Sequence, residues 1–199
     1  MTLEKLPYGY ADLEPYIDTH TLGVHYNYHS KNYLNKLKNL LKENGIKENI
    51  DFDILISKIA IGEVKNKDDI LFNLGGVINH NLYFKSISPR PTKPNNLLME
   101  MINNSFVSYD DFKSEFKKFA LSLKGSGYTY LLLDGTSLKI VNTKNQDCPI
   151  FYGLTPLLTL DMWEHAYYIN YENKKDLYID KFLEIANFKD ANEIIDRLK

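Results

Sequence analysis

The first half of the chain carries hydrophobic residues at the spacing of amphipathic helices. Four leucines between positions 34 and 41 share one helical face, and the polar sequence ENG that follows them is a typical helix end. This pattern predicts a long helix over residues 21–44. Residues 1–17 combine proline, glycine and aromatic residues, and we expect an ordered, extended arm there.

Two shorter helical patterns follow, over residues 51–60 and from about 66–69 to 84. Gly75 and Gly76 lie inside the second of them, where each glycine destabilises a helix by about 1 kcal/mol relative to alanine. A pair of glycines at such a position indicates that another helix or a functional site packs closely against it.

A proline-rich segment, SISPRPTKPNN at 86–96, separates this helical half from a mixed second half. We expect a first domain over residues 1–88 and a second over 89–199. The pattern predicts an α+β fold, in which an all-helical N-terminal half is followed by a mixed half with a small antiparallel sheet. The elements predicted for the second half are helices over 96–106, 108–123 and from 164 onward, and strands over 128–134, 137–143 and 153–160.

Composition narrows the class of protein. The chain has 199 residues, 44% of them hydrophobic and 25% charged, which is ordinary for a folded globular protein. A net charge of −2 argues against a general nucleic-acid binder, which would show a basic stripe. No run of about 18 apolar residues is present, so we expect no membrane span. The start lacks the zones of a signal peptide and Cys148 is the single cysteine, so we expect a cytoplasmic protein without disulfide bonds.

Some of the five histidines lie in patterns that fit a site as well as ordinary structure. His25, His29 and Tyr33 follow one another at four-residue steps, so a helix places their side chains in one stripe. Such a stripe is equally typical of a half-exposed polar helix surface. His80 lies among apolar residues, where a hydrogen-bonded core histidine is common.

The segment DMWEHAYY, at 161–168, holds the chain's single tryptophan between acids and a histidine. Asp161 ends an apolar strand pattern and His165 follows four residues later, which also fits a helix N-cap and an ordinary helical residue. With His25 and His80 these residues give three imidazoles and one carboxylate, a set that suits iron or manganese at least as well as zinc. The spacing leaves open whether the four side chains converge.

Several motifs of the chain, in the same order, resemble those of one known family. The chain resembles the iron/manganese superoxide dismutases along nearly its whole length, and D-x-W-E-H-A-Y-Y at 161–168 is that family's signature. The resemblance implies a helical hairpin followed by an α/β domain with a three-stranded antiparallel sheet. The other matching segments are LPYGYADLEPYID at 6–18, H-x-x-x-H-x-x-x-Y at 25–33, FNLGGVINHNLYF at 72–84, GSGYTYLLL at 125–133 and NQDCPI at 145–150.

The resemblance implies a mononuclear manganese or iron centre, with one ion per chain, that converts superoxide to dioxygen and hydrogen peroxide. A solvent molecule would complete the coordination. The protein ligands that it implies are His25, His80, Asp161 and His165.

The resemblance also assigns roles around that centre. Tyr33 and Gln146 match the pair that holds the solvent by hydrogen bonds, and His29 matches a residue at the gateway of the substrate channel. Glu164 and Tyr168 match residues that cross a homodimer interface, where Glu164 bonds the partner's ligand histidine. Pairing of such dimers into a tetramer stays open.

Seven residues depart from the family's usual pattern, and two of them, Lys174 and Lys175, replace a usual arginine pair after the signature. Tyr28 and Ser30 stand where a basic residue and a second histidine are common, so we expect altered electrostatic steering of the anionic substrate. Phe84, Tyr128 and Tyr130 stand where tryptophan is frequent, so we expect a pocket of changed shape and polarity.

The position of one glutamine indicates the metal. Manganese-type members of the family carry the solvent-bonding glutamine in an NQD segment and have glycine in the facing helix, whereas iron-type members carry the glutamine in that helix. Gln146 lies in NQD and Gly76 occupies the helical position. The resemblance therefore favours manganese, with iron as the alternative.

Other functions use the same kinds of ligand. A mononuclear non-haem iron oxygenase or a metallohydrolase also binds its metal through histidine and aspartate. A metal-binding protein that kept the fold but lost turnover is a third hypothesis. Retention of Tyr33, Gln146 and all four ligand residues favours the dismutase.

Overall fold

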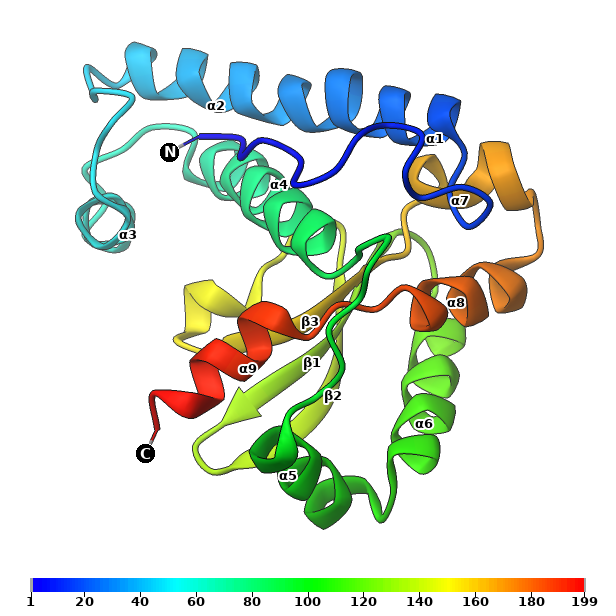
Figure 1. Cartoon of the computed structure of the whole chain (residues 1–199). Helices are drawn as coiled ribbons and strands as arrows, with labels where there is room; N and C mark the ends of the chain where they lie inside the picture. Colours follow the sequence, from blue (N-terminus) through cyan, green and yellow to red (C-terminus); the bar gives the residue numbers. More distant parts are fainter. Residues whose placement is uncertain (1, 199) are drawn as a thin grey trace.

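The structure, a computed structural model, describes residues 2–198 and has a helical first half and a mixed second half (Figure 1). This arrangement confirms the predicted fold class. The first half contains α1 (Thr19–Val24), the π-helical segment η1 (His25–Ser30), α2 (Lys31–Glu43), α3 (Phe52–Ala60) and α4 (Lys67–Lys85).

The predicted long helix is a continuous helical run from Thr19 to Glu43, but its centre has a wider turn. Residues His25–Ser30 are π-helical, and Oγ of Ser30 donates a 2.9 Å hydrogen bond to the carbonyl of His25. Short π-helical turns are rare and occur frequently at functional sites. A hydrophobic pattern does not reveal them, because residues four apart stay roughly aligned in either helix type.

The two long helical segments of the first half pack against each other. Leucines on one face of α2 contact α4, and α3 closes the end of the hairpin. Burial of this apolar surface, at about 25 cal/mol per Å², is the main force that holds the helices together. The buried core of this half consists of Leu37, Leu41, Leu55, Ile59, Ile70, Leu74 and Val77.

The second half contains three strands and five helices among the described residues, apart from one short 3₁₀ turn. Ser108 caps α6, since its Oγ accepts a hydrogen bond from the backbone amide of Asp111 and donates one to the Asp111 carboxylate. The elements are α5 (Asn96–Phe106), α6 (Tyr109–Ser122), β1 (Gly127–Asp134), β2 (Ser137–Lys144), η2 (Pro149–Tyr152), β3 (Thr155–Asp161), α7 (Glu164–Tyr171), α8 (Lys175–Glu184) and α9 (Lys189–Asp196).

The three strands form one antiparallel sheet in the order β2-β1-β3, which confirms the predicted sheet. The central strand β1 is buried nearly throughout. In the pairing of β1 with β3, Tyr128 lies opposite Asp161, so the last residue of β3 sits beside the first residues of β1. This register brings Asp161 to the edge of the sheet that faces the helical half.

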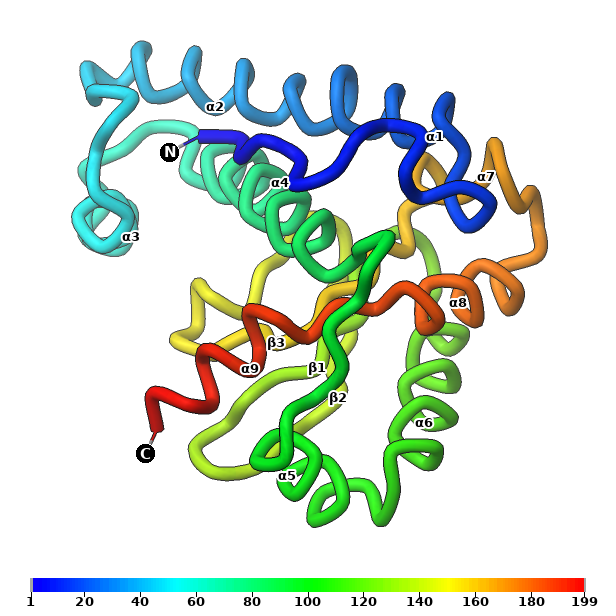
Figure 2. The backbone as a smooth tube through the Cα atoms, in the orientation of Figure 1, coloured from blue at the N-terminus to red at the C-terminus, as the bar shows by residue number. Residues whose placement is uncertain are grey.

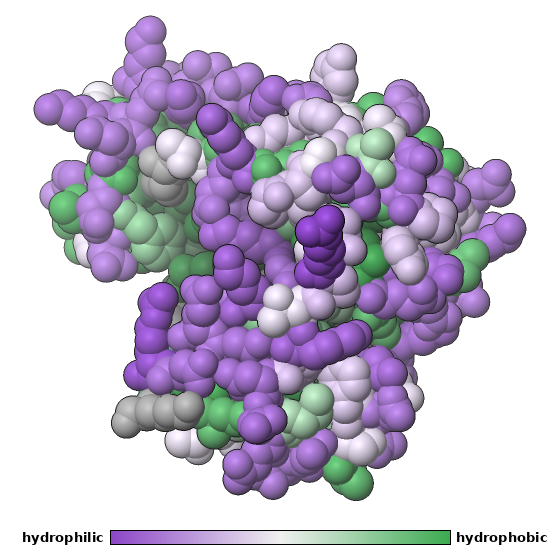
Figure 3. All heavy atoms as spheres, in the orientation of Figure 1, coloured by the Kyte–Doolittle hydropathy of each residue, from purple (hydrophilic) through white to green (hydrophobic). Residues whose placement is uncertain are grey.

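The two halves are also joined away from the sheet. The chain after α4 runs beside the segment between α8 and α9, where Ile87 pairs with Ala186 in an isolated antiparallel bridge (Figure 2). The view in Figure 3 shows a mostly hydrophilic face with a hollow beside α3. No helix in residues 2–198 is both long enough and apolar enough to span a membrane.

Candidate metal centre

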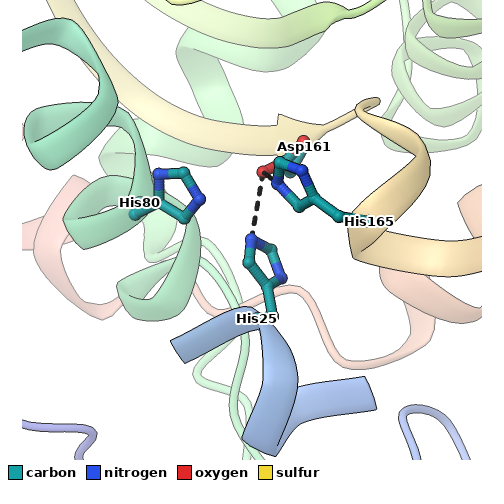
Figure 4. A group of neighbouring side chains, drawn as sticks. All are labelled: His25, His80, Asp161 and His165. Carbon is teal, nitrogen blue, oxygen red and sulfur yellow. Dashed lines mark ion pairs between the residues drawn. The ribbon is translucent and has the colours of Figure 1, made fainter. Parts of the chain in front are cut away.

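Four side chains from four different elements converge where the helical half meets the sheet (Figure 4). His25 comes from η1, His80 from α4, Asp161 from the end of β3 and His165 from the first turn of α7. One nitrogen or oxygen atom from each lies within 4.8 Å of those from the other three. The structure thus brings together all four residues that the sequence predicts as metal ligands.

The converging atoms lack ordinary hydrogen-bond partners within the described residues. Nε2 of His25, His80 and His165 and Oδ2 of Asp161 are all buried without such a bond. Oδ2 lies 3.3 Å from Nε2 of His25 and 3.4 Å from Nε2 of His165. Because buried polar atoms in proteins almost always have partners, four such atoms at one point fit a bound metal ion.

Hydrogen bonds to the opposite atoms of two side chains hold this orientation. Nδ1 of His80 lies 2.6 Å from the carbonyl oxygen of Gly76, and Oδ1 of Asp161 accepts a 2.8 Å bond from the backbone amide of Trp163. A carbonyl only accepts, so Nδ1 of His80 carries the proton and Nε2 keeps a free lone pair. Such outer contacts fix the ring tautomer and the direction of a metal ligand.

The protonation states of the cluster also suit metal binding. Burial lowers the pKa of His25 to about 4, although the Asp161 carboxylate opposes this effect. Burial likewise lowers the pKa of His80 well below its ordinary value. Burial by itself would raise the pKa of Asp161, but the neighbouring imidazoles of His165 and His25 outweigh it and hold that pKa well below its usual range. Neutral imidazoles and an ionised carboxylate are the forms that bind metals.

A hydrogen-bonded polar pair, the buried Gln146 and the half-buried Tyr33, lies beside the cluster. Nε2 of Gln146 donates a 3.0 Å hydrogen bond to Oη of Tyr33, and the ring of Tyr33 lies 5.3 Å from that of His80, centroid to centroid. Gln146 is completely buried, and one side of its segment borders a groove of about 420 Å³ next to α3. The two residues that the sequence predicts to act on solvent are therefore neighbours.

Comparison with known proteins supplies the family. The model of the alpha-hairpin domain of iron/manganese superoxide dismutases matches residues 1–88, and the model of their C-terminal domain matches residues 94–194. The chain belongs to the iron/manganese superoxide dismutase family. It is accordingly an oxidoreductase that acts on superoxide, with manganese or iron as its cofactor.

Curated relatives cover nearly the whole length of this dismutase. Superoxide dismutase [Mn] 2 of Bacillus anthracis is 35% identical over 96% of this chain and 92% of its own. Superoxide dismutase [Mn/Fe] 2 of Staphylococcus aureus strain N315 is 35% identical over 99% of this chain and 98% of its own.

Aromatic rings form the walls of the dismutase centre. Trp163 stacks on His165 with ring centroids 5.6 Å apart, and its indole N–H donates to the carbonyl of Asn145. The half-buried ring of His29 also stacks on His165, with ring centroids 4.2 Å apart. His29 is thus in contact with His165 and reaches the surface, as expected for a residue at an entrance.

Two departures from the family's usual sequence lie in the same wall. Phe84 packs at 5.0 Å from His25, and Tyr128 at 6.4 Å from His80, both measured between ring centroids. The predicted change of pocket shape therefore falls next to the centre itself.

The two glycines of α4 mark the closest approach of that helix to the site. A Cβ on Gly76 would lie 2.4 Å from Cδ1 of Tyr33, and a Cβ on Gly75 would lie 1.9 Å from the carbonyl oxygen of Gln146. Both distances are far below contact, so only glycine fits at either position. This confirms the close packing that the glycine pair predicts.

One polar residue of the site was not predicted from the sequence. Asn79 is completely buried, and its Nδ2 donates to the carbonyls of Gln146 and Asp147 at 3.2 and 3.3 Å. The sequence hint for Asn79 was an amide side chain in an apolar run directly before His80, because a buried amide needs hydrogen-bond partners.

Proposed function

We propose that the chain is a manganese-type superoxide dismutase whose metal is held by His25, His80, Asp161 and His165. The observation that carries the proposal is the convergence of four buried, unpartnered ligand atoms within 4.8 Å of one another. Gln146 in the NQD segment, beside Tyr33, supports manganese over iron. The manganese and manganese/iron names of the relatives are consistent with this choice.

A manganese ion held by these four residues would supply the electron chemistry of the reaction through its +3 and +2 oxidation states. Among the described residues Asp161 pairs with no lysine or arginine, so its carboxylate would compensate part of the metal's positive charge. Three neutral imidazoles add no charge of their own. Together these ligands support both oxidation states.

The residues around the ligands control proton transfer and the access of substrate to the centre. Gln146 and Tyr33 form a hydrogen-bonded pair beside the centre, where they hold solvent and deliver a proton to the developing peroxide. His29, half-buried against His165, lies where a small anion would enter. The aromatic walls keep bulk water away from the buried ligand atoms.

We further propose a homodimer through the exposed start of α7. Glu164 and Tyr168 are both exposed, and within the described residues Glu164 makes no ion pair or hydrogen bond. Its position directly before His165 suits a bond to the partner's ligand histidine. A domain division after residue 88 and a cytoplasmic location belong to the same proposal, and the single buried cysteine, Cys148, supports the location.

Metal analysis combined with a superoxide-decay assay tests the function. The proposal expects about one manganese per chain and rapid, catalytic decay. An enzyme that turns over only with an organic co-substrate would instead be an oxygenase. A protein that binds metal without accelerating the decay would be a binding protein of the same fold.

A further inference from the structure

Four side chains beside the centre form a hydrogen-bond chain that runs in one direction. Oη of Tyr130 lies 2.9 Å from Oδ1 of Asn79, whose Nδ2 lies 3.5 Å from Oε1 of Gln146. Nε2 of Gln146 in turn donates to Tyr33 at 3.0 Å. The chain starts on β1, crosses α4 and the NQD segment, and ends in η1–α2 at the metal centre.

The direction of this chain is set by the backbone around Asn79. Nδ2 of Asn79 faces the carbonyl oxygens of Gln146 and Asp147, which only accept hydrogen bonds. Oδ1 of Asn79 must therefore point the other way, where the hydroxyl of Tyr130 is its donor. A reversed Asn79 amide would place its oxygen against two carbonyls, which is strongly unfavourable.

The orientation of Asn79 carries over to Gln146. A donor at Nδ2 of Asn79 favours the Gln146 rotamer with Oε1 toward Asn79 and the NH₂ group toward Tyr33. The backbone carbonyl oxygen of Gln146 also lies close against Gly75, so the segment that carries Gln146 has little room to shift. Gln146, Asn79 and Tyr130 are each fully buried, which strengthens these bonds and excludes competing water.

We propose that Tyr130 is a positioning residue of this dismutase: through Asn79 it orients the Gln146 amide so that its NH₂ group faces Tyr33 and the metal. The proposal rests on the role proposed above for Gln146. It gives a function to a tyrosine hydroxyl at a position where the family frequently has tryptophan. Tyr130 touches neither metal nor substrate. Its hydroxyl acts through Asn79 at 2.9 Å and, more weakly, through the backbone carbonyl of Asp147 at 3.5 Å.

The test compares Tyr130→Phe with Tyr171→Phe in the metal-loaded enzyme. Both variants remove the hydroxyl of a buried tyrosine. The Tyr130 hydroxyl faces Oδ1 of Asn79 and, at 3.5 Å, the carbonyl of Asp147, whereas the Tyr171 hydroxyl donates to the backbone carbonyl of Tyr16, away from these four side chains. The first readout is hydrogen exchange of the peptide spanning 144–150, by mass spectrometry. The second is the ratio of activity with manganese to activity with iron.

The expected result is specific to Tyr130. Exchange of the 144–150 peptide rises about fivefold in Tyr130→Phe, the factor that corresponds to one ordinary hydrogen bond, and stays unchanged in Tyr171→Phe. The manganese-to-iron activity ratio falls by a similar factor in Tyr130→Phe, because the Gln146 amide no longer donates firmly.

Three results would overturn the proposal: unchanged exchange in Tyr130→Phe, an equal rise in Tyr171→Phe, or faster exchange with an unchanged activity ratio. A wild-type activity ratio near one would count against the manganese-type function instead. The exchange data would in that case still decide whether Tyr130 holds the Gln146 segment.

Discussion

Nδ1 of His80 lies 2.6 Å from the carbonyl oxygen of Gly76, one helical turn earlier in α4. The helix backbone thus fixes the direction of a ring whose other nitrogen faces three further ligand atoms. His80 thus has a hydrogen-bonded core nitrogen on one side of its ring and, on the other, a nitrogen placed to bind the proposed metal.

Loss of one ligand should therefore empty the centre. We expect His80→Ala and Asp161→Ala each to lose most of the bound metal and nearly all activity, since each removes one of four protein ligands. Mass spectrometry gives the metal content per chain, and superoxide decay gives the activity. His20→Ala, at an exposed histidine outside the centre, is the control. Variants that keep near one atom per chain together with activity would refute the ligand assignment.

The dimer proposal predicts that assembly and metal retention change together. Glu164→Ala should weaken the dimer and release metal faster, because Glu164 is expected to bond the partner's ligand histidine. Sedimentation and metal content measure the two effects, with Glu193→Ala on the exposed side of α9 as the control. A wild-type monomer with full activity would end this idea.

Substitution by alanine should change the stability of the protein in opposite directions at two helical glycines. A Cβ on Gly75 would lie 1.9 Å from the Gln146 carbonyl, whereas a Cβ on Gly23 in α1 would meet nothing within 4 Å. We expect Gly75→Ala to displace the Gln146 segment, with lower stability and lower activity. Gly23→Ala should stabilise the protein by up to about 1 kcal/mol. Denaturant unfolding and activity assays compare them, and equal behaviour would contradict the packing described here.

One strained backbone position lies far from the centre. Val107, at the end of α5, has φ of +73° and is 84% exposed, although β-branched residues rarely adopt positive φ. We expect Val107→Gly to raise the free energy of unfolding by about 1 kcal/mol, because glycine adopts this conformation without strain. Activity should stay the same. A less stable Val107→Gly variant in urea unfolding would show that the strain is not there.

Local patterns were sufficient to predict the elements, because helices and strands follow from short-range periodicity and capping. The leucines of α2, the Ser108 N-cap and the apolar strands are each determined by the sequence of their own segment. Convergence of the ligands depends instead on the Tyr128–Asp161 register and on the packing of η1 against α4, which are properties of distant contacts. Only the family resemblance indicated that the four residues meet.

Two features of the site had no clear sequence signal. The π-helical turn at His25–Ser30 preserves four-residue spacing, so the pattern of hydrophobic and polar residues fits it as well as an α-helix. The Asn79 amide and the Tyr130 hydroxyl bond each other across 51 positions, and no local rule connects them.

Relocation of the amide is a demanding test of metal choice. Gln146→Ala combined with Gly76→Gln should shift activity toward iron, but a Cβ at Gly76 would lie 2.4 Å from Cδ1 of Tyr33. The Tyr33 ring must move to accept the change. Gly76→Ala with Gln146→Ala therefore serves as the control, since it introduces the same crowding without an amide. If the double variant depends on manganese as strongly as the wild type does, the position of the amide does not determine which metal supports activity.

The activity of wild-type protein reconstituted separately with manganese and with iron tests the central claim most directly. In the proposed centre, Gln146 would donate a hydrogen bond to solvent and oppose its protonation, which would lower the reduction potential of the metal. Mn(III) is the stronger oxidant, so its reduction potential needs this lowering. The same effect would lower the reduction potential of Fe(III) too far for it to accept an electron from superoxide readily. At equal metal occupancy, we predict clearly faster superoxide decay with manganese. Equal rates would show that glutamine position does not decide the metal, and activity confined to the iron form would contradict the account outright.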